Sequence, residues 1–164
     1  MKKMALWQFH LALIPQSWLE AVENIESLFS DEGYDTSSAW ASHDSQALEA
    51  TLGSVLPRGK SWSPALTVWG SSETNDIRLW RSGSAVTSVD VRFDLRNPNM
   101  ALFKAVIGIA RQLQLAILVP SLRRTIGSDV DLLLRAAGES DAAHFVLDPL
   151  SFLSQLDAAN ARAT

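Results

Sequence analysis

The sequence predicts an α+β fold, in which a central and mainly antiparallel sheet packs with four to five helices. Segments with alternating apolar residues, which are typical of strands, occur near the N-terminus and in the middle of the chain. Segments with apolar residues three or four apart, which are typical of helices, flank them. The 164 residues, 47% of them hydrophobic, suffice for one domain over 1–164 with a buried core.

The chain is expected to begin with a strand over residues 4–14, because the apolar side chains of this segment alternate. Lys2 and Lys3 precede it as in a signal peptide, but Gln8 and His10 interrupt the apolar run and no cleavage site follows. No other run approaches the ~20 apolar residues that a membrane span needs. We therefore expect a cytoplasmic protein that makes no contact with a membrane.

Two helices are expected next. The first covers 17–30, where Ser17 opens a Ser-x-x-Glu capping box and apolar residues follow at helical spacing. The second covers 45–56 and is capped by Asp44. Residues 34–43 between them are expected to be irregular.

A three-stranded antiparallel meander is expected over 65–69, 77–80 and 86–95, with turns rich in glycine and serine between the strands. Its third strand alternates most clearly, with apolar residues on one face and polar residues on the other. The polar face carries Ser88, Asp90, Arg92 and Asp94.

The last third is expected to alternate between helices and strands. The expected elements are a helix over 100–113, a buried strand over 115–119, a helix from Ser128 to Gly138, an edge strand over 144–147 and a helix opened by Asp148 and Pro149.

No residue set in the sequence indicates an enzyme. The chain has no cysteine, which excludes thiolate metal sites and a cysteine nucleophile, and its three histidines lie in different elements. The glycines at 53 and 59 have five residues between them rather than the four of a P-loop, and the segment leaves a helix rather than a strand. We therefore expect no catalytic residues, no metal and no cofactor.

Charge is distributed unevenly along the chain. The net charge is −4, which disfavours direct binding to nucleic acid, and no lysine or arginine lies between Lys3 and Arg58. This stretch contains the acids Glu20, Glu23, Glu26, Asp31, Glu32, Asp35, Asp44 and Glu49. Such a surface steers a basic partner towards it, or else it serves only to keep the protein dissolved, and the sequence leaves both interpretations open.

The charged face of the third meander strand also has two interpretations. Asp90, Arg92 and Asp94 either form ion pairs on a solvated surface, which we favour, or a binding stripe. Neighbouring arginines lower the pKa of these carboxyls, which makes them poor general acids. Among the six tryptophans, Trp40 and Trp62 lie in irregular segments and are the best candidates for exposure and for partner contact.

The middle and end of the chain resemble small bacterial immunity proteins over residues 64–153. The resemblance rests on a strand ending in Trp-Gly, a second strand, and a third strand with an Arg-x-Asp-x-Arg pattern, followed by a helix, a short strand and another helix. The matching segments are 65–70, 77–80, 89–96, 115–119, 145–149 and the pair Phe152 and Leu153.

The resemblance implies a stoichiometric inhibitor of a polymorphic toxin, delivered by type VI or contact-dependent secretion in competition between bacteria. We expect a basic toxin, with a nuclease favoured, and docking through the eight acids, the charged strand face, Trp40 and Trp62. One alternative is a small enzyme or ligand-binding domain with a site formed by Trp69, Trp80, Arg92 and Asp94. Another alternative is an adaptor or chaperone that binds a secreted effector outside its toxic domain.

Overall fold

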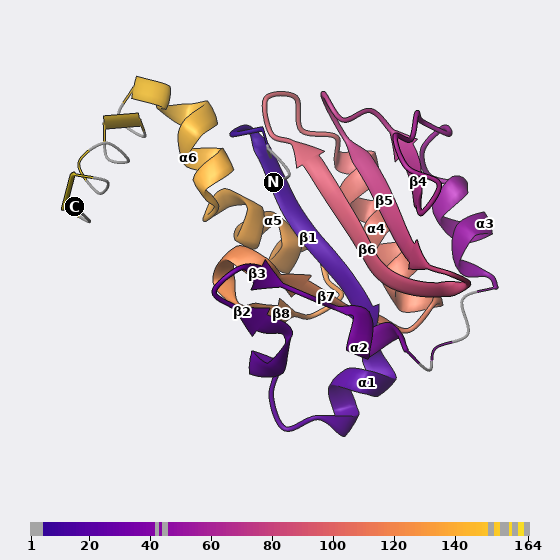
Figure 1. Cartoon of the computed structure of the whole chain (residues 1–164). Helices are drawn as coiled ribbons and strands as arrows, with labels where there is room; N and C mark the ends of the chain where they lie inside the picture. The colour runs from indigo at the N-terminus through magenta and orange to yellow at the C-terminus, as the bar shows by residue number, and fades with distance from the viewer. Residues whose placement is uncertain are drawn as a thin grey trace.

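A computed structural model describes residues 5–41, 43, 46–150, 153–154, 158 and 161–162 of the chain. It has the α+β fold that the sequence predicts: a six-stranded antiparallel sheet with helices on both faces (Figure 1). The strand order is β4-β5-β6-β1-β7-β8, so the N-terminal strand lies inside the sheet. The strands are β1 (Gln8–Pro15), β4 (Leu66–Gly70), β5 (Asp76–Ser82), β6 (Ala85–Asp94), β7 (Leu115–Val119) and β8 (Arg124–Ile126).

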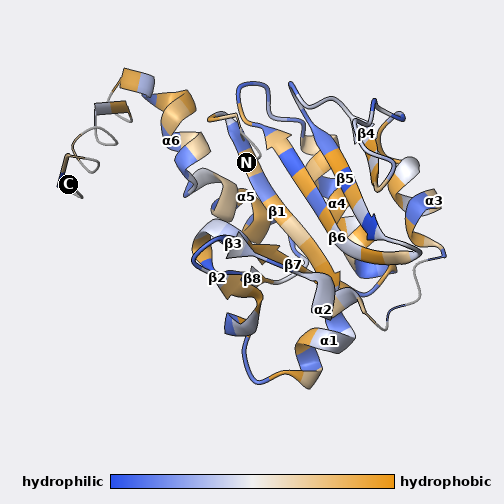
Figure 2. Ribbon diagram, in the orientation of Figure 1, coloured by the Kyte–Doolittle hydropathy of each residue, from blue (hydrophilic) through white to orange (hydrophobic). Residues whose placement is uncertain are grey.

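One face of the sheet is apolar and carries the main core. Helices cover it: α3 (Leu48–Gly53), α4 (Met100–Gln112) and α5 (Val130–Gly138), with α6 (Asp141–Leu147) beyond them. In Figure 1, α4 lies behind β5 and β6, and in Figure 2 hydrophobic and hydrophilic residues alternate along these strands. Phe103 of α4 stacks on Phe93 of β6 with ring centroids 4.2 Å apart. Asn99 caps α4 by accepting a hydrogen bond from the backbone N–H of Leu102 at 3.1 Å.

Part of the opposite face is covered by residues 16–40, which we call the N-terminal cap. The cap consists of α1 (Gln16–Ala21), a 3-10 turn η1 (Glu26–Leu28), a hairpin of β2 (Phe29–Ser30) and β3 (Gly33–Tyr34), and α2 (Ser37–Trp40). Leu28 and Ala39 of the cap are buried with Ala12, Ile14 and Leu118 of the sheet. This smaller cluster holds the cap against β1 and β7.

The rest of that face, over β5 and β6, carries polar side chains. The loop between β4 and β5 folds across one end of it and reaches β1. Gln8 of β1 donates from Nε2 to the carbonyl oxygens of Thr74 at 2.6 Å and Ser72 at 3.2 Å. The loop therefore encloses the polar end of the sheet.

The helix expected over 17–30 is wrong beyond Ala21. The chain leaves α1 at Val22, and the Asn24 side chain accepts a hydrogen bond from the backbone N–H of Glu26 at 3.0 Å, which stabilises a turn. Leu28 then points into the cap's core, and Phe29 begins the β2–β3 hairpin. The capping box is also wrong, because α1 begins at Gln16 and no side chain caps it.

The strand expected over 144–147 is wrong, since these residues belong to α6. Ser140 caps this helix by accepting a hydrogen bond from the backbone N–H of Ala143 at 3.2 Å. The two alanines that follow Asp141 favour a helix and are buried. The helix that begins there therefore continues through the apolar residues 145–147, which had suggested a strand. Residues 149, 150, 153, 154, 158, 161 and 162 are also helical.

Most other expected elements are confirmed within a residue or two: the meander, the helix over 100–113, the strand over 115–119 and the end of α5 at Gly138. Asp129 rather than Ser128 caps α5, and the helix expected over 45–56 is shorter. The expected cap residue Asp44 lies outside the described residues. No helix in the described part of the chain has the length and apolar composition needed to cross a bilayer.

Candidate functional site

The exposed surface of the N-terminal cap carries a concentration of carboxylates. We call this set the acidic surface. All of its members are exposed: Glu20, Glu23, Glu26, Asp31, Glu32 and Asp35. They come from α1, from the turn η1 and from the β2–β3 hairpin, because the apolar residues between them point towards the sheet. The sequence therefore divides the cap into an apolar inner side and an acidic outer side.

Positive charge near the acidic surface is sparse. Among its described members, Glu26 alone forms an ion pair, in which Arg123 Nη2 lies 2.8 Å from Glu26 Oε2. Both side chains are exposed, so this pair contributes little to stability. Asp35 accepts hydrogen bonds from the hydroxyl and the backbone N–H of Ser37, which lower its pKa. Asp35 is thus charged at neutral pH, and all six side chains are accessible to a partner.

Specific hydrogen bonds fix the cap against the sheet. Thr36 donates from its hydroxyl to the carbonyl of Thr87 at 2.8 Å, and Trp40 donates from Nε1 to the carbonyl of Leu13 at 3.2 Å. Trp40 is 1% exposed, so its expected exposure is wrong and it cannot contact a partner directly. Trp40 is the large apolar side chain of the four-residue helix α2, and its ring packs in the main core.

Tyr34 anchors the cap's hairpin to β6 and β1. Its hydroxyl donates to Asp90 Oδ1 at 2.8 Å and lies 2.9 Å from His10 Nε2. Because the phenol has one proton, His10 Nε2–H is the donor in the second contact. Burial raises the pKa of Tyr34 far above its usual value, and the charge and hydrogen bond of Asp90 raise it further. The phenol therefore stays neutral.

The polar face of β6 is not the solvated surface that the sequence predicts. Asp90, Arg92 and Asp94 are all buried. Asp76 of β5 lies directly opposite Arg92, and its carboxylate accepts two hydrogen bonds from that guanidinium and one from Arg78 Nε at 3.0 Å. Tyr34 of the cap reaches Asp90, Asn75 of the β4–β5 loop bonds the backbone of Asp94, and the Trp62 ring lies beside Arg78. The charges therefore neutralise one another inside the protein.

A second arginine–carboxylate pair lies at the end of β6. Arg96 donates to both oxygens of Asp94, at 3.0 and 2.9 Å, and stacks on the Trp7 ring at 4.1 Å. The hydrogen bonds from the Arg96 side chain hold the pKa of Asp94 below its usual value. Asp94 therefore stays ionised, as expected for a carboxyl beside an arginine.

Trp62 is exposed, as the sequence predicts, with 60% of its surface accessible. Its ring meets Trp80 edge to face, with centroids 6.2 Å apart, and the Arg78 guanidinium lies 4.8 Å from its centroid. These contacts hold the ring in one position on the surface. Glu49 lies on the other side of the sheet in α3, where it pairs with Arg81 at 3.2 Å, so it does not belong to the acidic surface.

The alternative site of Trp69, Trp80, Arg92 and Asp94 is not assembled. Trp69 pairs with Ile77 and faces the apolar side towards α3, whereas Trp80 and Arg92 face the polar side. Trp69 and Trp80 therefore do not lie on one face, as a site formed by both would require. On strands β4 and β5, Trp69 pairs with Ile77 and Leu66 pairs with Trp80. Paired residues share a face, whereas Leu66 and Trp69, three positions apart on one strand, lie on opposite faces. The two tryptophans therefore lie on opposite faces of the sheet.

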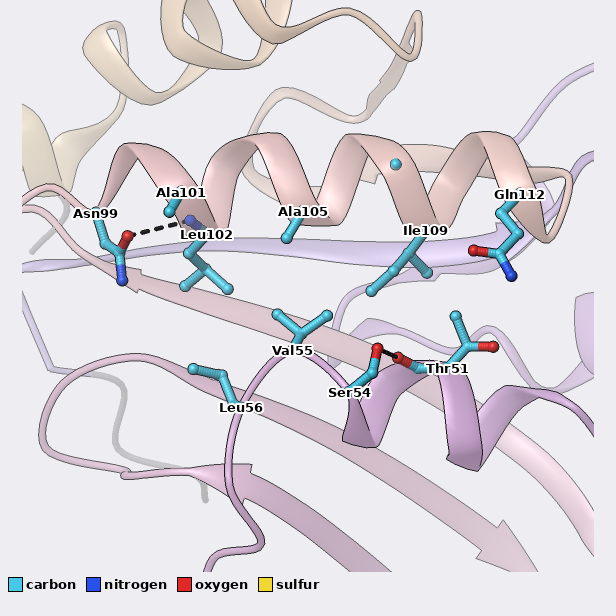
Figure 3. A pocket seen from close by; sticks show the side chains of 11 residues that line it. Thr51, Ser54, Val55, Leu56, Asn99, Ala101, Leu102, Ala105, Ile109 and Gln112 are labelled. Carbon is cyan, nitrogen blue, oxygen red and sulfur yellow. Dashed lines mark hydrogen bonds between the residues drawn. The ribbon is translucent and has the colours of Figure 1, made fainter.

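Two surface hollows lie away from these residues. One, of about 490 Å³, runs between α3 and α4 and is lined by Val55, Leu56, Ala105 and Ile109, among others (Figure 3). The other, of about 340 Å³, lies between α1 and the end of α4. The described residues include no group of three or more histidine, aspartate or glutamate side chains placed to bind a metal ion.

Sequence reasoning missed Asp76, Arg78 and Tyr34. A signal for the first two was present, because Asp-x-Arg occurs at 76–78, 90–92 and 94–96, within or next to strands predicted to be neighbours. Residues two apart on a strand share a face, so the repeat predicts stacked carboxylates and guanidinium groups. Tyr34 carried no comparable signal, since its partners lie 24 and 56 residues away.

No protein-family model, no curated protein and no solved structure matches this chain.

Proposed function

We propose that this protein is an immunity-type inhibitor, which binds a basic toxin with one-to-one stoichiometry through the acidic surface of its N-terminal cap. The observation that carries the proposal is the exposure of six carboxylates on one structural unit, with a single ion pair among them in the described structure. The resemblance of residues 64–153 to immunity proteins supplies the biological class.

Electrostatics makes the acidic surface suited to rapid capture. Unpaired surface charges of one sign raise the association rate of an oppositely charged protein by orders of magnitude at low ionic strength. An inhibitor that protects its own cell must bind before the toxin acts, so a fast association rate matters as much as affinity. The remaining residues supply the rigid support for this surface.

The cap is already ordered before any partner arrives. Tyr34, Thr36 and Trp40 tie it to three separate backbone or carboxylate acceptors in the sheet. Binding through a pre-organised surface avoids the entropic cost of ordering a loop. This favours tight binding by the cap over a role as a flexible tail.

The toxin that best fits the acidic surface is a nuclease. Enzymes that act on nucleic acid bind phosphates with lysine and arginine, so a row of carboxylates competes for the same groups. A nuclease is proposed because of the charge of the acidic surface. In this proposal the acidic surface mimics the phosphate backbone of the nucleic acid on which the toxin acts.

No specific observation favours the enzyme alternative. The four residues expected to form a ligand site lie on two faces of the sheet, and the two hollows described above are lined by other residues. Arg92 and Asp94 are engaged by Asp76 and Arg96. They support the sheet rather than a substrate.

The test is co-expression with the product of the neighbouring gene in a susceptible bacterium. We expect the neighbouring product to stop growth, the present chain to restore it, and the two proteins to purify together in a one-to-one complex. Toxicity without rescue, or no toxicity at all, would contradict the proposal.

A matched pair of variants locates the binding surface. Glu23→Lys changes an exposed member of the acidic surface, and Asp131→Lys changes an exposed acid on α5. We expect the first to weaken rescue and the second to leave it intact. Equal effects would place the docking surface elsewhere.

A further inference from the structure

Trp62 is the only exposed tryptophan, tyrosine or phenylalanine in the part of the chain that the structure describes. Tryptophan is enriched among the residues that dominate binding energy at protein interfaces, because it buries a large area with little loss of side-chain freedom. A single exposed apolar residue is otherwise an ordinary surface feature. Two further observations, its rigid support and its position beside the N-terminal cap, distinguish Trp62 from such a residue.

The loop that carries Trp62 is organised by the serines on either side of it. Ser61 donates from its hydroxyl to the carbonyl of Leu66 at 2.6 Å, and its oxygen accepts a hydrogen bond from the backbone N–H of Ser63 at 3.2 Å. The Ser63 hydroxyl accepts one from the backbone N–H of Ala65 at 3.2 Å. The loop is therefore ordered in the free protein, so a partner that buries the indole does not have to order it.

The side chains beneath the Trp62 ring are also fixed. Arg78, whose guanidinium lies 4.8 Å from the ring centroid, is buried and donates to the carboxylate of Asp76. Trp80 meets the ring edge to face. Trp62 thus rests on β5, and the part of the ring that faces away from this strand is open to a partner.

The register of the sheet places Trp62 beside the cap. Arg78 of β5 lies directly opposite Asp90 of β6, and Asp90 accepts the hydrogen bond from Tyr34 of the cap. Neighbouring strands are about 4.8 Å apart, so the residues that support Trp62 and Tyr34 are adjacent at one level of the sheet. Asp35, a member of the acidic surface, follows Tyr34 directly.

A second line of contacts joins Trp62 to the cap. The carbonyl of Trp80, whose ring touches Trp62, accepts a hydrogen bond from the Thr87 hydroxyl at 3.3 Å. The carbonyl of Thr87 accepts one from Thr36 of the cap at 2.8 Å. A standard interface buries about 800 Å² of each partner, a patch roughly 30 Å across, so one partner is large enough to contact the acidic surface and Trp62 together.

Charge alone does not make a tight inhibitor. Exposed carboxylates raise the association rate, whereas slow dissociation depends on apolar and aromatic groups that lose water at the centre of the interface. The large apolar residues of the cap pack against the sheet, so the acidic surface has no such group of its own. Trp62 supplies it from the neighbouring loop.

We propose that Trp62 is the apolar anchor of the toxin interface: its indole enters an apolar pocket of the toxin that lies beside the basic groups bound by the acidic surface. This inference rests on the proposed function and gives the two parts of the surface different tasks. The acidic surface controls the rate of association, and Trp62 controls the rate of dissociation.

Binding kinetics with the purified product of the neighbouring gene test this division. Trp62→Ala is expected to speed dissociation about thirtyfold or more and to change association by less than about twofold. Trp62→Phe keeps an aromatic ring and should retain most of the affinity. The matched control, Met100→Ala, removes another exposed apolar side chain at the start of α4, behind the sheet in Figure 1, and should leave both rates unchanged.

Fluorine NMR gives a readout that does not depend on a disruptive substitution. The chain labelled with 5-fluorotryptophan has six tryptophan residues, and Trp62→Phe identifies the resonance of Trp62. Unlabelled toxin should shift this resonance and abolish its shift between H₂O and D₂O, because the ring becomes buried. The resonance of Trp40, which is buried in the free protein, should change less.

The outcomes separate this inference from the proposed function. A complex that forms, but leaves the Trp62 resonance and the dissociation rate of Trp62→Ala unchanged, would overturn this inference alone. A wild-type chain that does not bind the neighbouring gene product would overturn the proposed function, and this inference with it. Urea unfolding of free Trp62→Ala at a midpoint close to that of the wild-type chain would exclude a loss of binding through misfolding.

Discussion

Asp76 and Arg92 face each other across neighbouring strands, and the carboxylate of Asp76 accepts hydrogen bonds from the guanidinium through both of its oxygens. Asp76 is 0% exposed, so this bidentate pair lies wholly inside the protein. Arg78 donates to the same carboxylate from the same strand. One carboxylate therefore compensates two buried cations, and the sheet depends on it.

Removing that carboxylate should destabilise the fold strongly. Asp76→Ala leaves Arg78 and Arg92 as buried charges without their acceptor, which costs about 3–5 kcal/mol. Urea unfolding followed by tryptophan fluorescence measures the change. The exposed control Asp31→Ala is expected to change stability by less than about 0.5 kcal/mol.

The same network provides a second test. Replacing all three residues with apolar ones of similar volume (Asp76→Leu, Arg78→Met and Arg92→Met) removes the buried charges together. This triple variant should be more stable than Asp76→Ala, because it leaves neither arginine buried without the Asp76 carboxylate, while Asp90 keeps its hydrogen bond from Tyr34. If it were less stable, the strands would need the ionic contacts themselves.

Tyr34 is the only tyrosine of the chain, so its ionisation can be followed by ultraviolet absorbance. We expect no phenolate signal in the folded protein at pH 10 to 11, because burial and Asp90 raise the pKa of Tyr34. An unfolded sample should titrate near pH ~10. Titration of the folded protein near pH 10 would show that the hydroxyl is accessible.

The raised pKa of Tyr34 also predicts how stability depends on pH. Above pH ~10 the unfolded chain loses the phenol proton and the folded chain keeps it, so stability falls as pH rises, by up to ~1.4 kcal/mol per pH unit. Tyr34→Phe should lack this slope. At pH 7 the variant should be about 1–3 kcal/mol less stable, because Asp90 loses a donor.

At acid pH, Asp94 should make the stability of the fold depend on pH in the opposite direction. Its pKa is lowered in the folded state by the hydrogen bonds from Arg96, so the pair stabilises the fold above pH ~4 and loses this effect as pH falls through the lower folded value. Arg96→Met should therefore reduce stability at pH 7 more than at pH 3. The control is Lys104→Met, at an exposed residue of α4. The difference in unfolding free energy between this variant and the wild-type chain should change less between pH 7 and pH 3.

The acidic surface should control the rate at which a basic partner binds. Glu23→Lys is expected to slow association several-fold at low salt and to have little effect at about 0.5 M salt, where surface charges are screened. Dissociation should change less. Stopped-flow or surface-based kinetics at two salt concentrations measures both rates, with Asp131→Lys as the variant that should leave them unchanged.

The sequence predicted the α+β class and most of the sheet because each strand of the meander carries its own period-two pattern. The alternation of residues 86–95 was enough to place Val91 inside and Arg92 on the other face. The local pattern predicted the wrong structure where contacts with another part of the chain determine the conformation. The segment after Ala21 reads as a helix, but Asn24 turns it and Leu28 is buried against the sheet.

The candidate site was predicted in part for the same reason. Acids that stand between apolar residues project outwards, so the exposure of Glu23 and Asp31 follows from pattern. The burial of Asp90 and Trp40 does not follow, because it depends on which segments cross the sheet. The cap and the β4–β5 loop do so through contacts such as that between Gln8 and Thr74, which no local pattern encodes.

The position of β1 has a consequence for synthesis. Residues 8–15 leave the ribosome well before their partners, which are β6 at 85–94 and β7 at 115–119. At translation rates of roughly 5–20 residues per second, this apolar strand waits about 5–20 s for β7 to be made. During that time it is a natural target for chaperones that bind extended apolar segments, and the sheet closes only after β7 has been made.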